Sequence, residues 1–110
     1  MTIQGLLKGL FFGIALVGLV ACSSRPVRQI VLADVAIKAA QKAKADSLAT
    51  DLYRKAENHY LRAQKDYRDG YFDSCRKFAD KARRLAEQAE YRAILKQAKI
   101  KGTGSANDYE

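Results

Sequence analysis

The chain has 110 residues, with 20 lysine and arginine residues against 12 aspartate and glutamate residues, one histidine, two cysteines and no tryptophan. A chain of this length forms one modest domain, which excludes a two-domain enzyme and a deep substrate cleft. Residues 1–21 contain a single charged side chain, Lys8, whereas every acidic residue lies beyond Cys22. The N-terminal 21 residues and the rest of the chain are therefore chemically distinct segments.

The N-terminal segment has the layout of a secretory signal. A short start containing Lys8 precedes an uncharged run of 13 residues from Gly9 to Ala21. A helix that crosses a hydrocarbon layer of ~30 Å needs about 20 apolar residues, so this run is too short for a permanent membrane span. We therefore expect residues 1–21 to be a cleaved signal peptide.

The signal ends in Leu19-Val20-Ala21-Cys22, which resembles the signal of bacterial lipoproteins. The resemblance implies cleavage after Ala21, attachment of a diacylglycerol to the Cys22 thiol and acylation of the freed amine. Two or more acyl chains anchor a protein stably, because each buried CH₂ contributes ~0.8 kcal/mol. Ser23 stands where aspartate favours the inner membrane in that family, so we expect an outer-membrane anchor facing the periplasm. An ordinary cleaved signal, or a buried structural Cys22, is the alternative.

The remaining chain is predicted to be helical almost throughout, with residues 22–27 as a short tether and residues 102–110 as a flexible tail. No proline occurs after Pro26, and good helix formers fill most positions. Two successive apolar stripes have alternating spacings of four and three residues, which is typical of coiled-coil packing. The stripes are Ala49, Tyr53, Ala56, Tyr60, Ala63 and Tyr67, followed by Tyr71, Cys75, Phe78, Ala82, Leu85 and Ala89.

Gly70 lies between the two stripes and suits the left-handed conformation that ends a helix, which predicts an antiparallel hairpin. An upstream stripe from Ile30 to Ala40 falls on the opposite helical face from the stripe that begins at Ala49, so we expect a break between them. The predicted fold class is all-α, an antiparallel helical hairpin with an additional N-terminal helix. The helices are expected at about 28–45, 48–69 and 71–100, within a helical domain of residues 28–101.

Residues 49–98 resemble a short, alanine-rich bacterial lipoprotein domain of unknown function, which implies an envelope protein without an assigned reaction. A weaker resemblance is to a single tetratricopeptide-type hairpin. Such a hairpin cannot bury its own face, so the N-terminal helix or self-association would have to cover it. The residues that carry the first resemblance are Leu52, Ala56, Ala63, Gly70, Tyr71, Ala79, Ala82, Ala86 and Ala89.

The residues that bear reactive chemistry do not form a catalytic set. Cys75 is the one thiol left when Cys22 is lipidated, and its place on an apolar stripe favours burial over a redox or dimer role. A pair between Cys75 and His59 fits the hairpin, but no orienting group or oxyanion donor accompanies it. One histidine and one thiol are too few for a usual metal site. We therefore expect no catalysis, cofactor or small-molecule substrate.

Basic residues cluster on the last predicted helix, with acidic residues at pairing offsets. A solvated helix face is one interpretation, and a binding face for anionic lipid head groups or peptidoglycan carboxylates is the other. The cluster comprises Arg76, Lys77, Lys81, Arg83 and Arg84. The expected pairs are Asp73 with Lys77, Asp80 with Arg84, and Arg83 with Glu87.

The sequence thus predicts a lipid-anchored envelope lipoprotein that acts as a structural or protein-interaction module. The alternative is a module that binds peptidoglycan or anionic lipid through its basic helix face. The expected partners are the membrane, through Cys22, and an envelope protein, peptidoglycan or a second copy. Nucleic acid is not expected, because the anchor places the domain outside the cytoplasm.

Overall fold

The computed structural model describes residues 24–106 of the chain. The predicted signal peptide, the box at Leu19 to Cys22 and the last residues of the predicted tail, 107–110, lie outside the described residues. Every element within the described range is a helix, which confirms the all-α class. The helices are α2 (Val27–Lys42), α3 (Ala45–Leu48), α4 (Thr50–Asp69) and α5 (Phe72–Ala106).

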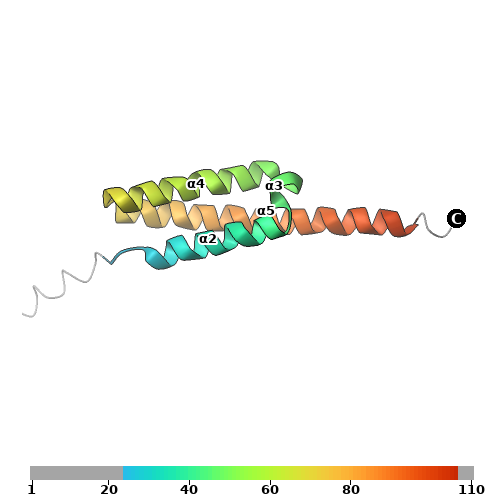
Figure 1. Ribbon diagram of the computed structural model, residues 1–110, viewed down its shortest axis with the longest axis horizontal. Helices are drawn as coiled ribbons and strands as arrows, with labels where there is room; N and C mark the ends of the chain where they lie inside the picture. Colours follow the sequence, from blue (N-terminus) through green and yellow to red (C-terminus); the bar gives the residue numbers. More distant parts are fainter. Residues whose placement is uncertain (1–23, 107–110) are drawn as a thin grey trace, which may run out of the picture.

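Helix α5 is the central element of the bundle. It packs extensively against both α4 and α2, whereas α2 and α4 contact each other much less. Helices α2 and α5 run in the same direction and α4 runs against both, as Figure 1 shows. The predicted antiparallel hairpin is therefore α4 and α5, and α2 is the additional helix that covers its open side.

The break between α2 and α4 falls where the opposed stripes predict it, but it contains a short helix that the sequence does not reveal. Helix α2 ends at Lys42, earlier than expected, and Lys44 then adopts a left-handed conformation with φ 60°. That conformation costs a non-glycine residue roughly 1–2 kcal/mol. It redirects the chain so that Ala45 and Ala49, at the two ends of the turn, are both buried.

The turn between α4 and α5 is the one predicted. Gly70 has φ 82°, and the backbone N–H of Tyr71 donates to the carbonyl of Asp66 at 2.8 Å, as expected for a left-handed helix end. The structure corrects the prediction for Tyr71, which the sequence pattern places on the apolar stripe at the start of the last helix. It precedes the first residue of α5 and is 64% exposed, because it lies in the turn rather than on the helical stripe.

The core consists mainly of alanine. Small side chains let helices approach closely, so contact area comes from backbone proximity as well as side-chain volume. Tyr60, Tyr67, Phe78 and Leu85 border this alanine core and are half-buried. The buried alanines are Ala33, Ala36, Ala40, Ala45, Ala49, Ala56, Ala63, Ala79, Ala82, Ala86, Ala89 and Ala93, and Ile37, Tyr53 and Cys75 join them.

Helix α5 continues past the turn that joins α2 to α4 (Figure 1) and ends at Ala106. Residues 102–106, which the sequence places in the tail, are therefore helical. Gly102 and Gly104 each cost about 1 kcal/mol relative to alanine in a helix, which does not by itself end one. The Thr103 hydroxyl donates to the Lys99 carbonyl at 2.9 Å and supports this last part. Within the described residues, no helix combines the length and apolar character that a membrane crossing requires.

Candidate anion-binding surface

The basic cluster predicted on α5 divides between two sides of the helix. Arg76 donates to the carboxylate of Asp73 at 2.7 Å and to the backbone carbonyl of Ser24, three residues before the start of α2. Arg83 donates to Glu87 at 2.9 Å, as predicted. Arg76 therefore lies on the side of α5 that faces α2, and Arg83, seven residues later, falls on the same side of the helix. Neighbouring carboxylates compensate both charges.

The other three residues of the cluster, Lys77, Lys81 and Arg84, are exposed. No ion pair within the described residues involves any of them. The predicted pairs of Asp73 with Lys77 and of Asp80 with Arg84 do not form there. Asp73 instead meets Arg76, three residues along the helix, so its carboxylate is already engaged.

Helix α4 adds two nitrogen-bearing side chains to this part of α5, and both gather around Phe78. The His59 ring stacks on the Phe78 ring with a centroid separation of 5.6 Å and an interplanar angle of 20°. The Arg62 guanidinium lies 5.2 Å from the same centroid, and the Lys81 ammonium 5.6 Å from it. Cations attract the electron-rich face of an aromatic ring, so Phe78 holds nitrogen donors from both helices close together.

A shallow groove of about 340 Å³ runs beside this cluster, lined by His59, Lys81, Arg84, Leu85 and Gln88. Its lining contains no acidic residue. Lysine, arginine and glutamine side chains donate hydrogen bonds, and an imidazole donates through at least one nitrogen. The groove therefore has the electrostatic character of a site for an anion. Sequence reasoning found Lys81 and Arg84 but missed the contribution of α4.

The groove opens onto a longer face of α5 that carries no acidic residue. At about 100° per residue in an α-helix, its members fall within a sector roughly 100° wide. All of them are exposed, whereas Asp80, Glu87 and Glu90 fall on the adjoining side toward α2. We call this surface the outward face of α5, and it consists of Lys77, Lys81, Arg84, Gln88, Tyr91, Arg92, Leu95 and Lys99.

A second groove separates α2 from α4, because both helices pack on α5 more than on each other. It measures about 320 Å³ at the end lined by Val27, Ile30, Val31, Gln64, Tyr67 and Arg68, and this lining is largely apolar. Farther along, Lys38 pairs with Asp34 at 2.6 Å and the Tyr60 hydroxyl donates to the same carboxylate at 3.4 Å. The hydrogen bond from Lys38 to Asp34 raises the pKa of Lys38. The Lys38 pair lies within α2, and the hydrogen bond from Tyr60 joins α2 to α4.

Cys75 and His59 occupy different surroundings. Cys75 is a free, fully buried cysteine, and burial raises the pKa of its thiol, which disfavours the reactive thiolate. The His59 ring packs against Phe78 instead, and no hydrogen bond joins the two side chains among the described residues. In the same part of the chain, the structure groups no three metal-ligating side chains in one place.

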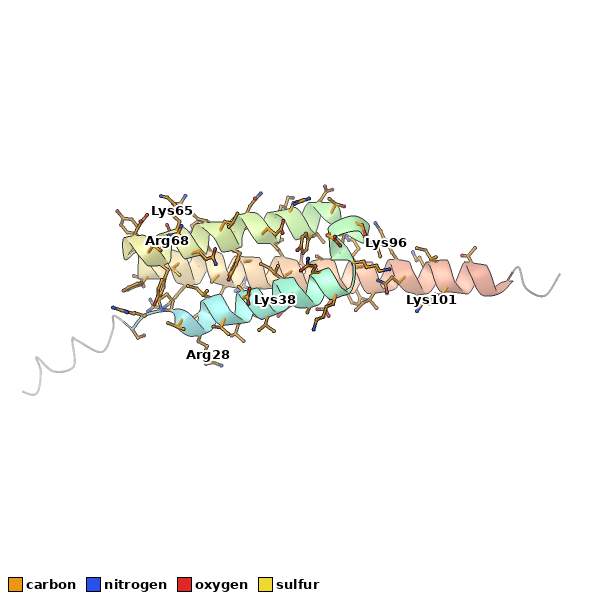
Figure 2. The ribbon with its side chains drawn as sticks, viewed as in Figure 1. Arg28, Lys38, Lys65, Arg68, Lys96 and Lys101 are labelled. Carbon is orange, nitrogen blue, oxygen red and sulfur yellow. The ribbon has the colours of Figure 1, made fainter. Side chains whose placement is uncertain are left out.

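Basic side chains also occur along the other helices, as Figure 2 shows for Arg28 and Lys38 on α2 and for Lys65 and Arg68 on α4. Lys65 and Lys38 each have an acidic partner.

Comparison of the chain with family models, curated proteins and solved structures gives no match.

Proposed function

We propose that this protein is a lipid-anchored component of the bacterial cell envelope that acts as a structural or interaction module without catalysis. The observation that carries the proposal is the box Leu19-Val20-Ala21-Cys22 close ahead of a helical bundle. Helix α2 begins at Val27. An extended chain spans about 3.3–3.6 Å per residue, so the tether after Cys22 reaches roughly 17 Å. A lipid on Cys22 would hold the bundle close to the membrane.

The surface of the bundle supports a docking role. Val27, Val31 and Val35 on α2 are each more than half exposed, and Tyr91 and Leu95 on α5 are 66% and 45% exposed. Covering apolar groups that remain in water after folding lowers the free energy, so such groups favour contact with a partner. The bundle therefore offers apolar surface to a partner on two of its helices.

The proposed anchor is tested by expressing the full chain in a bacterium supplied with a labelled fatty acid. We expect label in a membrane-associated product whose N-terminal residue is a modified Cys22, as read by mass spectrometry. The matched control is Cys22→Ser, which retains the rest of the chain and loses the label. A product that starts at Met1 and remains unmodified in the soluble fraction would contradict the proposal.

A second candidate function is the binding of anionic envelope material, and the groove between α4 and α5 favours it. His59, Lys81 and Arg84 line this groove without an acidic neighbour in the lining. The soluble mature chain with Cys22→Ser, titrated with inorganic phosphate and with acetate while backbone amide NMR shifts are recorded, tests it. We expect the shifts to concentrate at residues lining the groove and to weaken with salt as the screening length shrinks. Uniform small shifts over all helices would contradict a defined site.

A further inference from the structure

We infer that the outward face of α5 lies along the anionic phospholipid surface of the bilayer that holds the lipid on Cys22. In that arrangement the long axis of the bundle runs parallel to the membrane, and the lipid chains and α5 make two contacts with one surface. The inference deepens the proposed function, and its orientation rests on the proposed anchor at Cys22.

The first support is the separation of charge around α5. From residue 77 to residue 99 the outward face carries five basic side chains and no acidic one, while three acidic residues of the same stretch lie on the adjoining side toward α2. The structure pairs Arg83, on that adjoining side, with Glu87. The five basic side chains of the outward face are therefore exposed to solvent, and ion pairs compensate none of them within the described residues. A surface of negative charge complements it.

The second support is the apolar component of the same face, which selects a bilayer among anionic surfaces. Tyr91 and Leu95 lie on the outward face between Arg84 and Lys99, and both are substantially exposed. A helix that rests in a membrane interface places leucine and aromatic side chains into the acyl boundary while its basic residues meet the head groups. A hydrated network of carboxylates would attract the basic side chains but offer no apolar medium to Leu95. An anionic bilayer offers head groups to the basic side chains and an apolar medium to Tyr91 and Leu95.

The third support is the position of the proposed anchor. Arg76, one residue before Lys77, donates to the backbone carbonyl of Ser24. Ser24 lies two residues after Cys22, a chain length of at most about 7 Å. A lipid on Cys22 would therefore enter the bilayer at the end of α5 where the outward face begins, next to the side that faces α2. From there to Lys99 the helix rises about 33 Å, all of it within reach of the same surface.

A second copy of this chain is a poorer occupant of the face. Two outward faces brought together would oppose five basic side chains to five others, and like charges at an interface are unfavourable. An anionic lipid surface has the opposite sign. Each lysine or arginine near such a surface strengthens binding roughly fivefold.

The experiment measures co-sedimentation of the mature chain carrying Cys22→Ser with vesicles of phosphatidylglycerol and phosphatidylcholine. Lys81→Gln combined with Arg84→Gln removes two charges from the outward face. Lys65→Gln combined with Arg68→Gln removes two charges from exposed positions on α4. We expect the first double variant to lose roughly 25-fold in affinity and the second to lose less than about threefold. Equal losses would show attraction by net charge alone and would overturn the inference.

A fluorescent reporter tests the orientation directly, because the chain contains no tryptophan. Leu95→Trp places a single reporter on the outward face, and Leu61→Trp places one at a position on α4 that is 61% exposed. We expect a blue-shifted emission and quenching by brominated lipid for Leu95→Trp alone. Equal responses from both reporters, or binding to isolated peptidoglycan without binding to vesicles, would overturn the inference. Both vesicle experiments use the chain with Cys22→Ser, which carries no lipid of its own. Their failure would therefore leave the proposed anchor at Cys22 to be judged separately, by fatty-acid labelling.

Discussion

The hydroxyl of Ser74, in the first turn of α5, donates to the carboxylate of Asp66, near the end of α4, at 2.6 Å. Arg62 donates to the other carboxylate oxygen at 3.1 Å, and the Asp66 side chain is only 3% exposed. The backbone carbonyl of Asp66 also accepts from Tyr71. One residue thus joins both sides of the turn, through its side chain and through its backbone.

This arrangement predicts an acid-sensitive hairpin. The hydrogen bond from Ser74 first, and then the contact with Arg62, hold the pKa of Asp66 below its ordinary value of 3.8. The unfolded chain therefore binds the proton more readily than the folded one. The contribution of Asp66 to stability is fully present above the ordinary value and is lost as the pH falls through the lowered pKa of the folded state.

The prediction is checked with Asp66→Asn, which keeps the shape of the side chain and removes its charge. We expect a lower free energy of unfolding at pH 7, and a smaller decrease between pH 5 and pH 2 than in the original chain. Asp69→Asn is the matched control, because Asp69 lies three residues later on α4 and is 43% exposed. Urea unfolding at several pH values measures both. If the free energy of unfolding of Asp66→Asn fell with pH as much as that of the original chain, Asp66 would not be the source of the acid sensitivity.

Gly70 gives a second prediction, one that isolates backbone conformation. Its φ of 82° lies in the left-handed region, and no atom lies within 4 Å of the position where a Cβ would stand. Gly70→Ala therefore adds no clash and costs about 1–2 kcal/mol of stability through the left-handed conformation alone. Gly102→Ala, in a regular and exposed part of α5, is the control. It should raise helical circular dichroism without lowering stability. Equal effects of the two changes would exclude a special role for the turn.

Features of the fold that depend on spacing along the chain were predictable from the sequence. The stripe through Ala56 and Ala63 marks the buried face of α4 because three- and four-residue steps fix a helical face whatever its partner. Gly70 marks the turn because a left-handed position strongly favours glycine. The opposed stripes also required a break before Ala49. The short helix α3 within that break was not predictable, because it follows from the left-handed conformation of Lys44, and lysine has no preference for that conformation.

Features that depend on how one helix is rotated against another were not predictable. Arg76 and Lys77 are neighbours in the chain, but Arg76 turns toward Ser24 and Lys77 toward solvent. The sequence alone does not state which side of α5 receives α2. The contribution of His59 to the basic groove depends on the same rotation. Asp66 carried a signal that sequence reasoning did not use, since it lies three residues after the buried Ala63 and so falls near the core face.

The alanine core gives a third prediction. Ala82 is fully buried on α5, where neighbouring backbones leave little room for a longer side chain. Ala82→Leu should lower the free energy of unfolding by about 1–3 kcal/mol, because the added methyl groups force the helices apart. Ala98→Leu makes the same chemical change at an exposed position of α5 and should change stability by less than about 0.5 kcal/mol. Similar losses in the two variants, measured by urea denaturation, would show that the core is loosely packed.

Cys75 gives the last prediction, which concerns the reactivity of its thiol. The side chain is fully buried, and burial raises its pKa above the ordinary value of 9.0. We expect Cys75 to react slowly with iodoacetamide in the folded protein at pH 8 and rapidly in urea. Because the unfolded chain releases the thiol proton at lower pH than the folded one, stability should fall as the pH rises above about 9.

Substitutions separate the packing role of Cys75 from a chemical one. Cys75→Ser keeps the size of the side chain but buries a hydroxyl, which costs about 1–3 kcal/mol when the hydroxyl has no partner. Cys75→Ala removes the sulfur without adding a polar group, so it should cost less than Cys75→Ser. It should also remove the part of the decline in stability above pH 9 that comes from the buried thiol. Burial also raises the pKa values of Tyr53 and Tyr60, so a decline above about pH 10 should remain. Rapid alkylation of the folded chain, or a disulfide-linked dimer on a non-reducing gel, would instead mean that the α4–α5 seam opens readily enough to expose Cys75.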